Sequence, residues 1–271
     1  MPDIVDLIAR WWKQMLGVMI VSLVTVGVIT FLKPRQYLSV ASAVPASSFA
    51  TDKAKIFNEN IQTLYSTIGT PDDLDMILGT ANLDTTYLFV TDQFNLFDHF
   101  KINEQGNAAR TKAAYLLKRN TKVMRSDYGG LKVKVWDTDK NLAPQLANAI
   151  VEKLSAIHAD LQGYGNQTAL NSLIKSKQRI QQQLDSISGN HEVSAERIKN
   201  LEAQAMQHEK LINEYQLMVE SKPPVLIVVE KAKPSTWPDK PKRIMIMTAT
   251  VVLSFLFALL TALVLQRRKN S

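Results

Sequence analysis

Few residues in this chain of 271 have the types and spacing that catalysis or metal binding would need. The chain has no cysteine, which excludes a disulfide framework and thiol catalysis. Asp137 and Asp139 form a carboxylate pair, but they precede a predicted helix, where they would cap the helix and favour its dipole. The four histidines share no metal-ligand spacing: His99, His158, His191 and His208. We therefore expect no catalytic residue, no metal site and no cofactor.

The charge pattern points to a membrane rather than to nucleic acid. The formal net charge is +7, which is modest, whereas a nucleic-acid binder usually concentrates its basic residues on one face. Here the clustered basic residues flank two apolar runs, where the anionic headgroups of membrane lipids would lie. We expect membrane lipids as a partner and no nucleic acid.

The two apolar runs, residues 15–32 and 244–265, have the length of membrane-spanning helices. The second run has 22 residues and no charge. At 1.5 Å per residue it would extend roughly 33 Å, against about 30 Å for a hydrocarbon core. Trp11 and Trp12 precede the first run, as amphipathic rings do at a membrane interface. A cleaved signal peptide is the alternative for the first run, but the nearest A-x-A pattern, Ala41–Ala43, lies well past it, so we expect the helix to be retained.

Two spans put both termini on one side of the membrane. Basic residues flank both sides of the runs equally, so charge alone does not decide the orientation. We expect residues 1–14 and 266–271 to be cytoplasmic tails and the large loop to lie outside, because the tails are too short to act on their own.

Residues 33–140, together with 223–233, are expected to form an α/β base close to the membrane. Strand patterns at 37–44, 131–137 and 225–229 predict strands of one sheet. In the middle strand, the leucine and the valines point one way and the lysines the other.

Helices are also expected in this base. Helical spacing covers 55–68, a short helix begins at Asp73 and ends near Gly79, and a third covers 110–117. The region from 82 to 112 is the hardest to interpret. Its phenylalanines suggest core contacts: Phe89, Phe94, Phe97 and Phe100.

Residues 141–222 are expected to form a long helical hairpin. A first helix, 141–161, has Pro144 in its first turn, where proline is tolerated, and Gly163–Gly165 predicts a break. Two heptad seams then flank a turn at 188–190, which predicts an antiparallel, coiled-coil-like protrusion. The first seam contains Leu170, Leu173, Lys177, Ile180, Leu184 and Ile187. The second contains Ile198, Leu201, Ala205, His208, Ile212, Tyr215 and Val219.

So narrow a hairpin buries little surface and needs neighbours, which favours a homo-oligomer. For Lys177 we expect a snorkelling side chain or an acidic partner on another helix, with a polysaccharide contact as the alternative. For His208 we expect packing or pairing, with a pH-sensitive role as the alternative. The candidates for oligomer contacts along the seams are Lys177, Ile180, Leu184, Leu201, His208 and Ile212.

Residues 234–243 form a basic connector that enters the second span. Pro234, Pro238 and Pro241 remove backbone donors and fix φ, so the connector should be extended rather than helical. It is either a plain spacer or a stiff element that transmits position between the external body and the span.

One face of the second span carries small residues at intervals of four, which allow close helix approach in lipid. They are Thr250, Ser254, Ala258 and Ala262. Small residues are common in such helices, so the stripe is either incidental or a packing face for the first span or for a polymerase helix. Together these elements predict an α+β membrane protein, in which two transmembrane helices flank an α/β base with an extended helical protrusion.

Three stretches, in this order, resemble the polysaccharide co-polymerase family, also called the Wzz-type chain length determinant proteins. The first is the N-terminal span followed by the strand at Tyr37. The second, from Val133 to Asn148, is similar to the family's strand, Asp-x-Asp and Ala-x-x-(Leu/Ile)-Ala-Asn pattern. The third, Glu230 to Pro234 with Pro238 and Pro241, is similar to its proline-rich motif.

The resemblance implies a bacterial inner-membrane protein whose body faces the periplasm. Family members assemble as rings and influence the length of O-antigen, capsular or exopolysaccharide chains, so a polysaccharide polymerase and the growing glycan are implied partners. The second span has no glycine, where members often have them, and no G-x-x-x-x-G-K-[ST] motif occurs. We therefore expect the form without a fused tyrosine kinase, while a separate kinase partner remains open.

Two other hypotheses remain beside this non-enzymatic scaffold. A membrane-anchored periplasmic sensor or adaptor would bind a ligand or partner through the loop, although the short tails leave no room for an output domain. A periplasmic enzyme would need a nucleophile and base assembled across distance, because none is visible locally.

Overall fold

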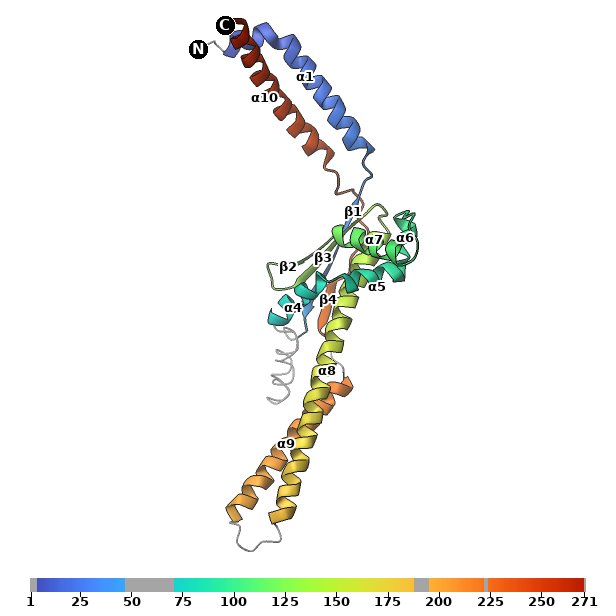
Figure 1. The fold of residues 1–271 in the computed structure, drawn as a ribbon, viewed down its shortest axis with the longest axis vertical. Helices are drawn as coiled ribbons and strands as arrows, with labels where there is room; N and C mark the ends of the chain where they lie inside the picture. The colour runs from blue at the N-terminus through green and yellow to red at the C-terminus, as the bar shows by residue number, and fades with distance from the viewer. Residues whose placement is uncertain (1–3, 47–70, 188–194, 222–223, 271) are drawn as a thin grey trace. The chain divides into compact units, whose positions relative to one another are not determined.

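The computed structural model describes residues 4–46, 71–187, 195–221 and 224–270 (Figure 1). The chain divides into two compact units. One comprises Met1–Leu38, Trp136–Ala143 and Pro234–Ser271, and the other comprises Ser39–Val135 and Pro144–Lys233. The first unit contains the two terminal helices and the connector, and the second contains most of the sheet and the remaining helices.

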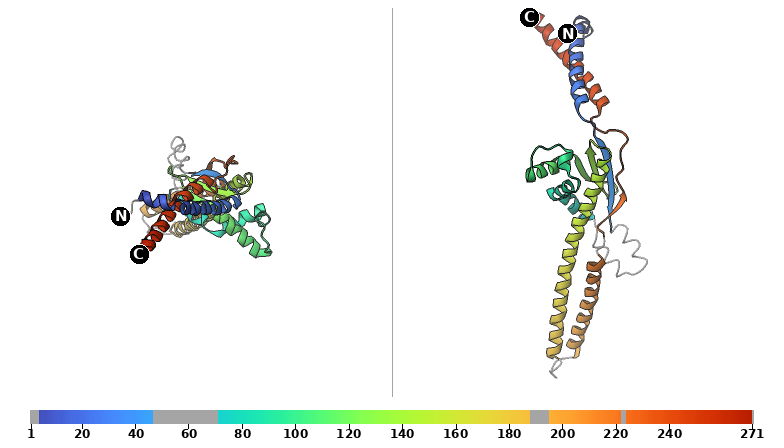
Figure 2. Two further views of the ribbon diagram at one scale, coloured as in Figure 1. Left: turned by 90° about the horizontal axis from the view of Figure 1, so that it is seen from above. Right: turned by 90° about the vertical axis from the view of Figure 1, so that its right-hand side faces the viewer.

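The first unit is built on two long helices, α1 (Ile4–Leu32) and α10 (Arg243–Asn270), which lie side by side in Figures 1 and 2. Each contains a 24-residue stretch that is long and apolar enough to cross a membrane, Ala9–Leu32 and Arg243–Gln266. This confirms the prediction of an apolar helix at each end of the α+β chain. Helix α1 begins well before the expected span, so most of residues 1–14 is helical.

The sheet has four strands in the order β2-β3-β1-β4. Strand β1 (Tyr37–Pro45) pairs antiparallel with β4 (Leu226–Glu230), with an irregularity in register between Ser42 and Ala43. Strand β3 (Leu131–Asp137) pairs antiparallel with β2 (Thr121–Arg125). The three predicted strands are therefore confirmed in one sheet, each within a residue of its expected end.

The sequence did not reveal strand β2, although the turn that follows it carries a signal. Gly129 has φ of 74°, a conformation that favours glycine, and its N–H donates to the carbonyl of Ser126 at 3.0 Å. A Cβ on the next residue, Gly130, would lie 2.9 Å from the carbonyl oxygen of Ala43. The Gly-Gly pair thus permits the turn and the close approach of β3 to β1.

The large apolar side chains point to the buried face of the sheet in β3 but not in β1. In β3 the predicted alternation holds, because Leu131, Val133 and Val135 are buried. In β1 the buried residues are the small ones, Ser39, Ala41 and Ala43, whereas the larger alternate side chains are half-buried. In Figure 2 (right) the teal and green helices α4–α7 lie on one side of the sheet.

These helices are α4 (Pro71–Ala81), α5 (Asp84–Phe94), α6 (Leu96–His99) and α7 (Gly106–Arg119). The helices predicted near 73–79 and 110–117 are confirmed and are longer than expected. The expectation that four phenylalanines form core contacts was wrong, because Phe89 is exposed and the other three are only half-buried. The core side chains are instead Leu74, Ile77, Tyr87, Val90, Leu96 and Leu117. The helix predicted at 55–68 lies outside the described residues.

Two long helices form the protrusion, α8 (Leu142–Ile187, 46 residues) and α9 (Ala195–Ser221, 27 residues). They run alongside each other in Figures 1 and 2, while the turn predicted at 188–190 lies outside the described residues. The break predicted at Gly163–Gly165 was wrong, because α8 continues through it. Glycine costs an exposed helix about 1 kcal/mol relative to alanine, which a helix of this length absorbs.

Glycine substitutions test this account of α8. A Cβ at Gly163 or Gly165 would meet nothing within 4 Å, so Gly163→Ala and Gly165→Ala should each stabilise the helix by roughly 0.5–1 kcal/mol. Melting of the purified protein, followed by circular dichroism at 222 nm, should shift upward by about 2–4 °C per kcal/mol. As the opposite control, Gly130→Ala should lower the melting temperature, because its Cβ would clash with Ala43. A lower melting temperature for either α8 variant would contradict the account.

Candidate functional site

The connector between β4 and α10 is bonded to the residues that follow α1. The backbone N–H of Gln36 donates to the carbonyl of Lys240 at 2.9 Å, and the N–H of Asp239 donates to the carbonyl of Gln36 at 2.8 Å. Residues 231–242 include no helix and no strand, as the prolines predicted. Pro234 and Pro238 are exposed and Pro241 is half-buried. The connector is thus anchored in its second half, between Pro238 and α10.

Trp136 fixes the same part of the connector from the end of β3. Its indole Nε1 donates to Asp239 Oδ2 at 2.7 Å. The ammonium of Lys240 lies 3.7 Å from the centroid of the Trp136 ring, within range of a cation–π interaction. The tryptophan therefore holds two successive connector residues, an acid through its N–H and a base through its ring face.

Asp137 and Asp139 both precede α8, which begins at Leu142. Asp137 Oδ1 accepts the N–H of Asp139 at 2.8 Å, and Asp139 Oδ1 accepts the N–H of Asn141 at 2.8 Å. The carboxylates therefore accept backbone N–H groups just before the helix.

Asn148 bonds the backbone of the segment that follows β4. Its Oδ1 accepts the N–H of Ala232 at 2.8 Å, and its Nδ2 donates to the carbonyl of Ala232 at 3.4 Å. The side-chain amide thus satisfies both backbone groups of a residue 84 positions later, and it attaches α8 to the segment that follows β4.

The stripe of small residues in α10 lies mostly buried. Ser254, Ala258 and Ala262 are 7%, 1% and 3% exposed, and Thr250 is half-buried. Ala258 and Ala262 form an apolar cluster with Met15 of α1, around which other side chains of both helices pack. The hydroxyls of Thr250 and Ser254 donate to carbonyls of their own helix, so the stripe offers a smooth surface for close approach.

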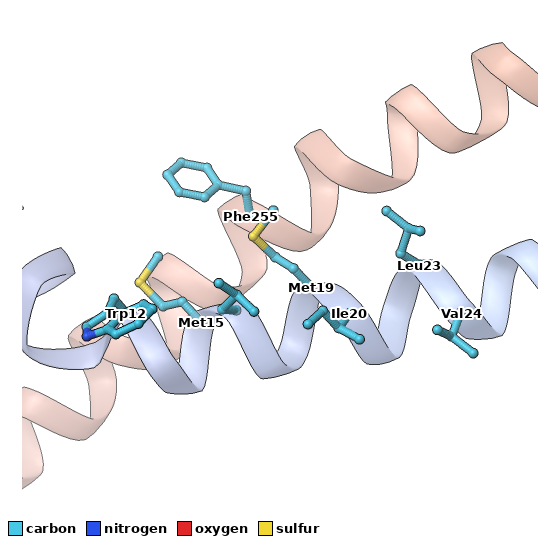
Figure 3. Close-up of a pocket in the computed structure, with 8 residues that line it drawn as sticks. Trp12, Met15, Met19, Ile20, Leu23, Val24 and Phe255 are labelled. Carbon is cyan, nitrogen blue, oxygen red and sulfur yellow. The ribbon is translucent and has the colours of Figure 1, made fainter.

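An apolar cavity of about 380 Å³ lies along the helix pair. Figure 3 shows its lining, with Trp12, Met15, Met19, Ile20, Leu23 and Val24 from α1 and Phe255 from α10. This lining suits lipid chains or another apolar helix and carries no group for catalysis.

The predicted seam residues lie along the protrusion with different exposure. Lys177 Nζ lies 3.2 Å from Glu209 Oε2 of α9, and Ile180 is buried. Leu184, Leu201, His208 and Ile212 are half-buried. Nδ1 of His208 lies 2.9 Å from the carbonyl of Gln204. Within one chain, Lys177 therefore meets an acid on the facing arm, while contacts of these residues with a second copy stay a prediction.

Titratable groups outside the helix pair show little sign of chemistry. His158 is buried, and its Nε2 lies 3.0 Å from Thr80 Oγ1, which links α8 to α4. Burial, with the nearby charge of Asp84, raises the pKa of Tyr87 to about 12, so its hydroxyl stays a donor to the carbonyl of Ala81. Within the described residues, no three His, Asp or Glu side chains gather as metal ligands would.

Sequence reasoning missed the residues that hold the connector. Gln36, Trp136 and Asp239 make its polar contacts, yet none belongs to a pattern with a fixed spacing, and their partners lie far away in the chain. The only local signal was Trp136 itself, a large side chain at the end of an otherwise regular strand.

Two solved structures that align with this chain are both described as polysaccharide co-polymerases. No family model and no curated protein matches the chain. A full-length bacterial polysaccharide co-polymerase aligns over 100% of this chain and 98% of its own, with a TM-score of 0.46 and 13% identity. A fragment of WzzB, a polysaccharide co-polymerase from Salmonella Typhimurium, aligns over 76% of this chain and 100% of its own, with a TM-score of 0.39 and 13% identity.

Proposed function

We propose that the chain is a non-enzymatic inner-membrane scaffold of the polysaccharide co-polymerase family. It forms a homo-oligomeric ring and regulates the length or export of a bacterial surface polysaccharide, whether O-antigen, capsule or exopolysaccharide. Helices α1 and α10 span the membrane, the short tails lie in the cytoplasm, and the body between them lies in the periplasm.

The observation that carries this proposal is that the stretches behind the resemblance are bonded to one another. Gln36, next to the first stretch, pairs with Lys240 in the connector. Trp136, in the second stretch, donates to Asp239, and Asn148, at its end, holds Ala232 of the third. Gln36 and Trp136 are thus bonded to the connector within one compact unit, and Asn148 is bonded to Ala232 within the other. Such bonds between residues far apart in sequence are expected if the motifs serve positioning.

The proposed mechanism is positional. The bonded connector sets where the chain enters the second span, and its prolines restrict the backbone around that point. The ring would then hold a polymerase or a growing glycan in a fixed position and would not react with it. A separate tyrosine kinase is a further partner that this mechanism admits.

A free edge of the sheet supports assembly with a second copy. Strand β4 is the last strand in the order, so its outer edge pairs with no described strand. Ile227, Val228 and Val229 are exposed on it, and an exposed apolar edge strand is a template for pairing with another chain. The protrusion adds exposed apolar side chains: Leu161, Tyr164, Ile174, Met206 and Leu217.

Sizing the full-length protein in gentle detergent tests the assembly. The wild-type protein should elute as a homo-oligomer. Val229→Lys should give monomers with an unchanged melting temperature, because Val229 is 60% exposed and a charged edge resists pairing. A strain that carries this variant should lose control of surface glycan length.

Tyr128→Lys is the control, since Tyr128 is 94% exposed in a turn away from β4, and it should leave the oligomer and the glycan ladder intact. A wild-type monomer, or wild-type ladders from a strain without the gene, would contradict the proposal.

The small-residue stripe gives a second prediction. Ala258→Leu adds bulk where α10 meets Met15 of α1, and overpacking of this kind costs typically about 1–3 kcal/mol. We expect normal membrane insertion but an altered distribution of glycan lengths on gels. Ala249→Leu, on an exposed position of the same helix, is the matched control and should behave as wild type. Wild-type lengths with Ala258→Leu would count against a packing role.

The connector gives a third prediction. Replacing Pro234, Pro238 and Pro241 together by alanine removes the restriction on φ and should change the modal glycan length without lowering the protein level. Pro224→Ala, which lies outside the connector and is exposed, should leave the modal length unchanged. If the triple variant left the distribution of glycan lengths unchanged, the connector would be only a spacer.

A further inference from the structure

A basic cleft lies where the connector meets α10. Its volume is about 820 Å³, and it is lined by Arg35, by residues 237–243 and by the first turns of α10. Four of the lining residues are cations, Arg35, Lys240, Lys242 and Arg243, and one is an acid, Asp239. The formal charge of the lining is therefore +3, which is four cations less one carboxylate.

The cations are not neutralised by carboxylates of the residues that the structure describes. None of the four forms an ion pair with any carboxylate in the described part of the chain. The single acid in the lining, Asp239, already accepts the indole N–H of Trp136 through Oδ2. Nε of Arg243 is buried and has no hydrogen-bond partner within the described residues. A buried donor of a charged group without a partner is costly, so this arrangement favours an external acceptor.

Aromatic rings hold two of these cations in place. The ammonium of Lys240 lies 3.7 Å from the Trp136 ring centroid, and the guanidinium of Arg243 lies 4.5 Å from that of Phe31. A ring face orients a cation, but unlike a carboxylate it does not accept hydrogen bonds from the cation's N–H groups. The N–H groups therefore remain available to an anion.

Apolar groups beside the cations indicate that the anion belongs to an amphiphile. Ile244 and Met245, in the first turn of α10, line the cleft and are 84% and 69% exposed. Trp237, also in the lining, is 80% exposed. The apolar stretch of α10 starts at the cleft, and tryptophan is typical of the boundary between headgroups and hydrocarbon.

We propose that this cleft binds the diphosphate headgroup of a membrane lipid. A phosphodiester headgroup brings a single negative charge, whereas a diphosphate matches more of the +3 lining and offers more acceptors to guanidinium and ammonium donors. The site goes beyond the proposed function, since it needs only the helix pair in a bilayer and no control of chain length.

The test measures lipid binding to the purified full-length protein by native mass spectrometry in detergent. The probes are dioctanoylglycerol diphosphate, dioctanoyl phosphatidylglycerol and inorganic diphosphate. We expect the diphosphate lipid to bind at least about tenfold more tightly than phosphatidylglycerol, because charge-assisted hydrogen bonds are the strong ones. Inorganic diphosphate should bind more weakly than the diphosphate lipid, since it cannot use the apolar edge.

Lys242→Gln and Arg243→Gln should each weaken binding of the diphosphate lipid by roughly tenfold. Lys242 is exposed, so its variant should fold normally even if Arg243→Gln does not. Lys33→Gln is the matched control, because Lys33 is an exposed cation at the same end of α1 that does not line the cleft, and it should bind as wild type.

Three results would overturn the proposal. If Lys33→Gln and Lys242→Gln weakened binding of the diphosphate lipid equally, the lipid would be attracted by the general surface charge and not by the cleft. Equal binding of the diphosphate lipid and phosphatidylglycerol would remove the diphosphate specificity. Inorganic diphosphate that binds as tightly as the lipid would identify a soluble anion site instead. None of these results bears on oligomer size or glycan length, so this site and the proposed function fail independently.

Discussion

The antiparallel pairing of Gln36 with Lys240 is the constraint on which the arrangement of α1, α10 and the connector depends. The chain leaves α1 four residues before Gln36 and enters α10 three residues after Lys240, so this bridge fixes the separation of the two helix ends. With the ends fixed, the small residues of α10 can meet Met15 of α1 in one register. In a bilayer, where lipid tails are as apolar as leucine, such close packing of small residues is what holds helices together.

The sequence predicted elements where a local pattern determines structure. Alternation predicted β1 and β3, and a short apolar run predicted β4, each within one residue of its observed ends. The lengths of the two long apolar runs predicted α1 and α10. It failed where tertiary context decides. Gly163 and Gly165 predicted a break in α8. The free-energy cost of two glycines is small compared with the stability of a helix of 46 residues, so the helix continues. The phenylalanines from Phe89 to Phe100 looked like core residues, yet periodicity within short helices buries Tyr87, Val90 and Leu96 instead.

For the candidate site, the sequence identified residue types but not their partners. The prolines and the small-residue stripe were visible because each has a fixed spacing or a strong backbone effect. The contacts of Trp136 with Asp239 and Lys240 join residues about a hundred positions apart, and no single-sequence pattern encodes such pairs. The sequence showed basic residues beside the apolar runs but not the cleft itself, because Arg35 joins the connector cations only in the folded chain.

The small number of buried side chains in the protrusion gives a physical reason for the proposed assembly. Its ion pair, Lys177–Glu209, joins side chains that are 37% and 60% exposed, and such surface pairs contribute about 0–1 kcal/mol. Beyond the base, few of the described side chains in α8 and α9 are buried: Leu170, Ile180 and Met218. Long helices with so few buried contacts gain little from packing, and most helical stability in proteins comes from such packing. Neighbouring copies that cover the exposed apolar residues of the arms would supply the missing burial, so the ring and the hairpin would stabilise each other.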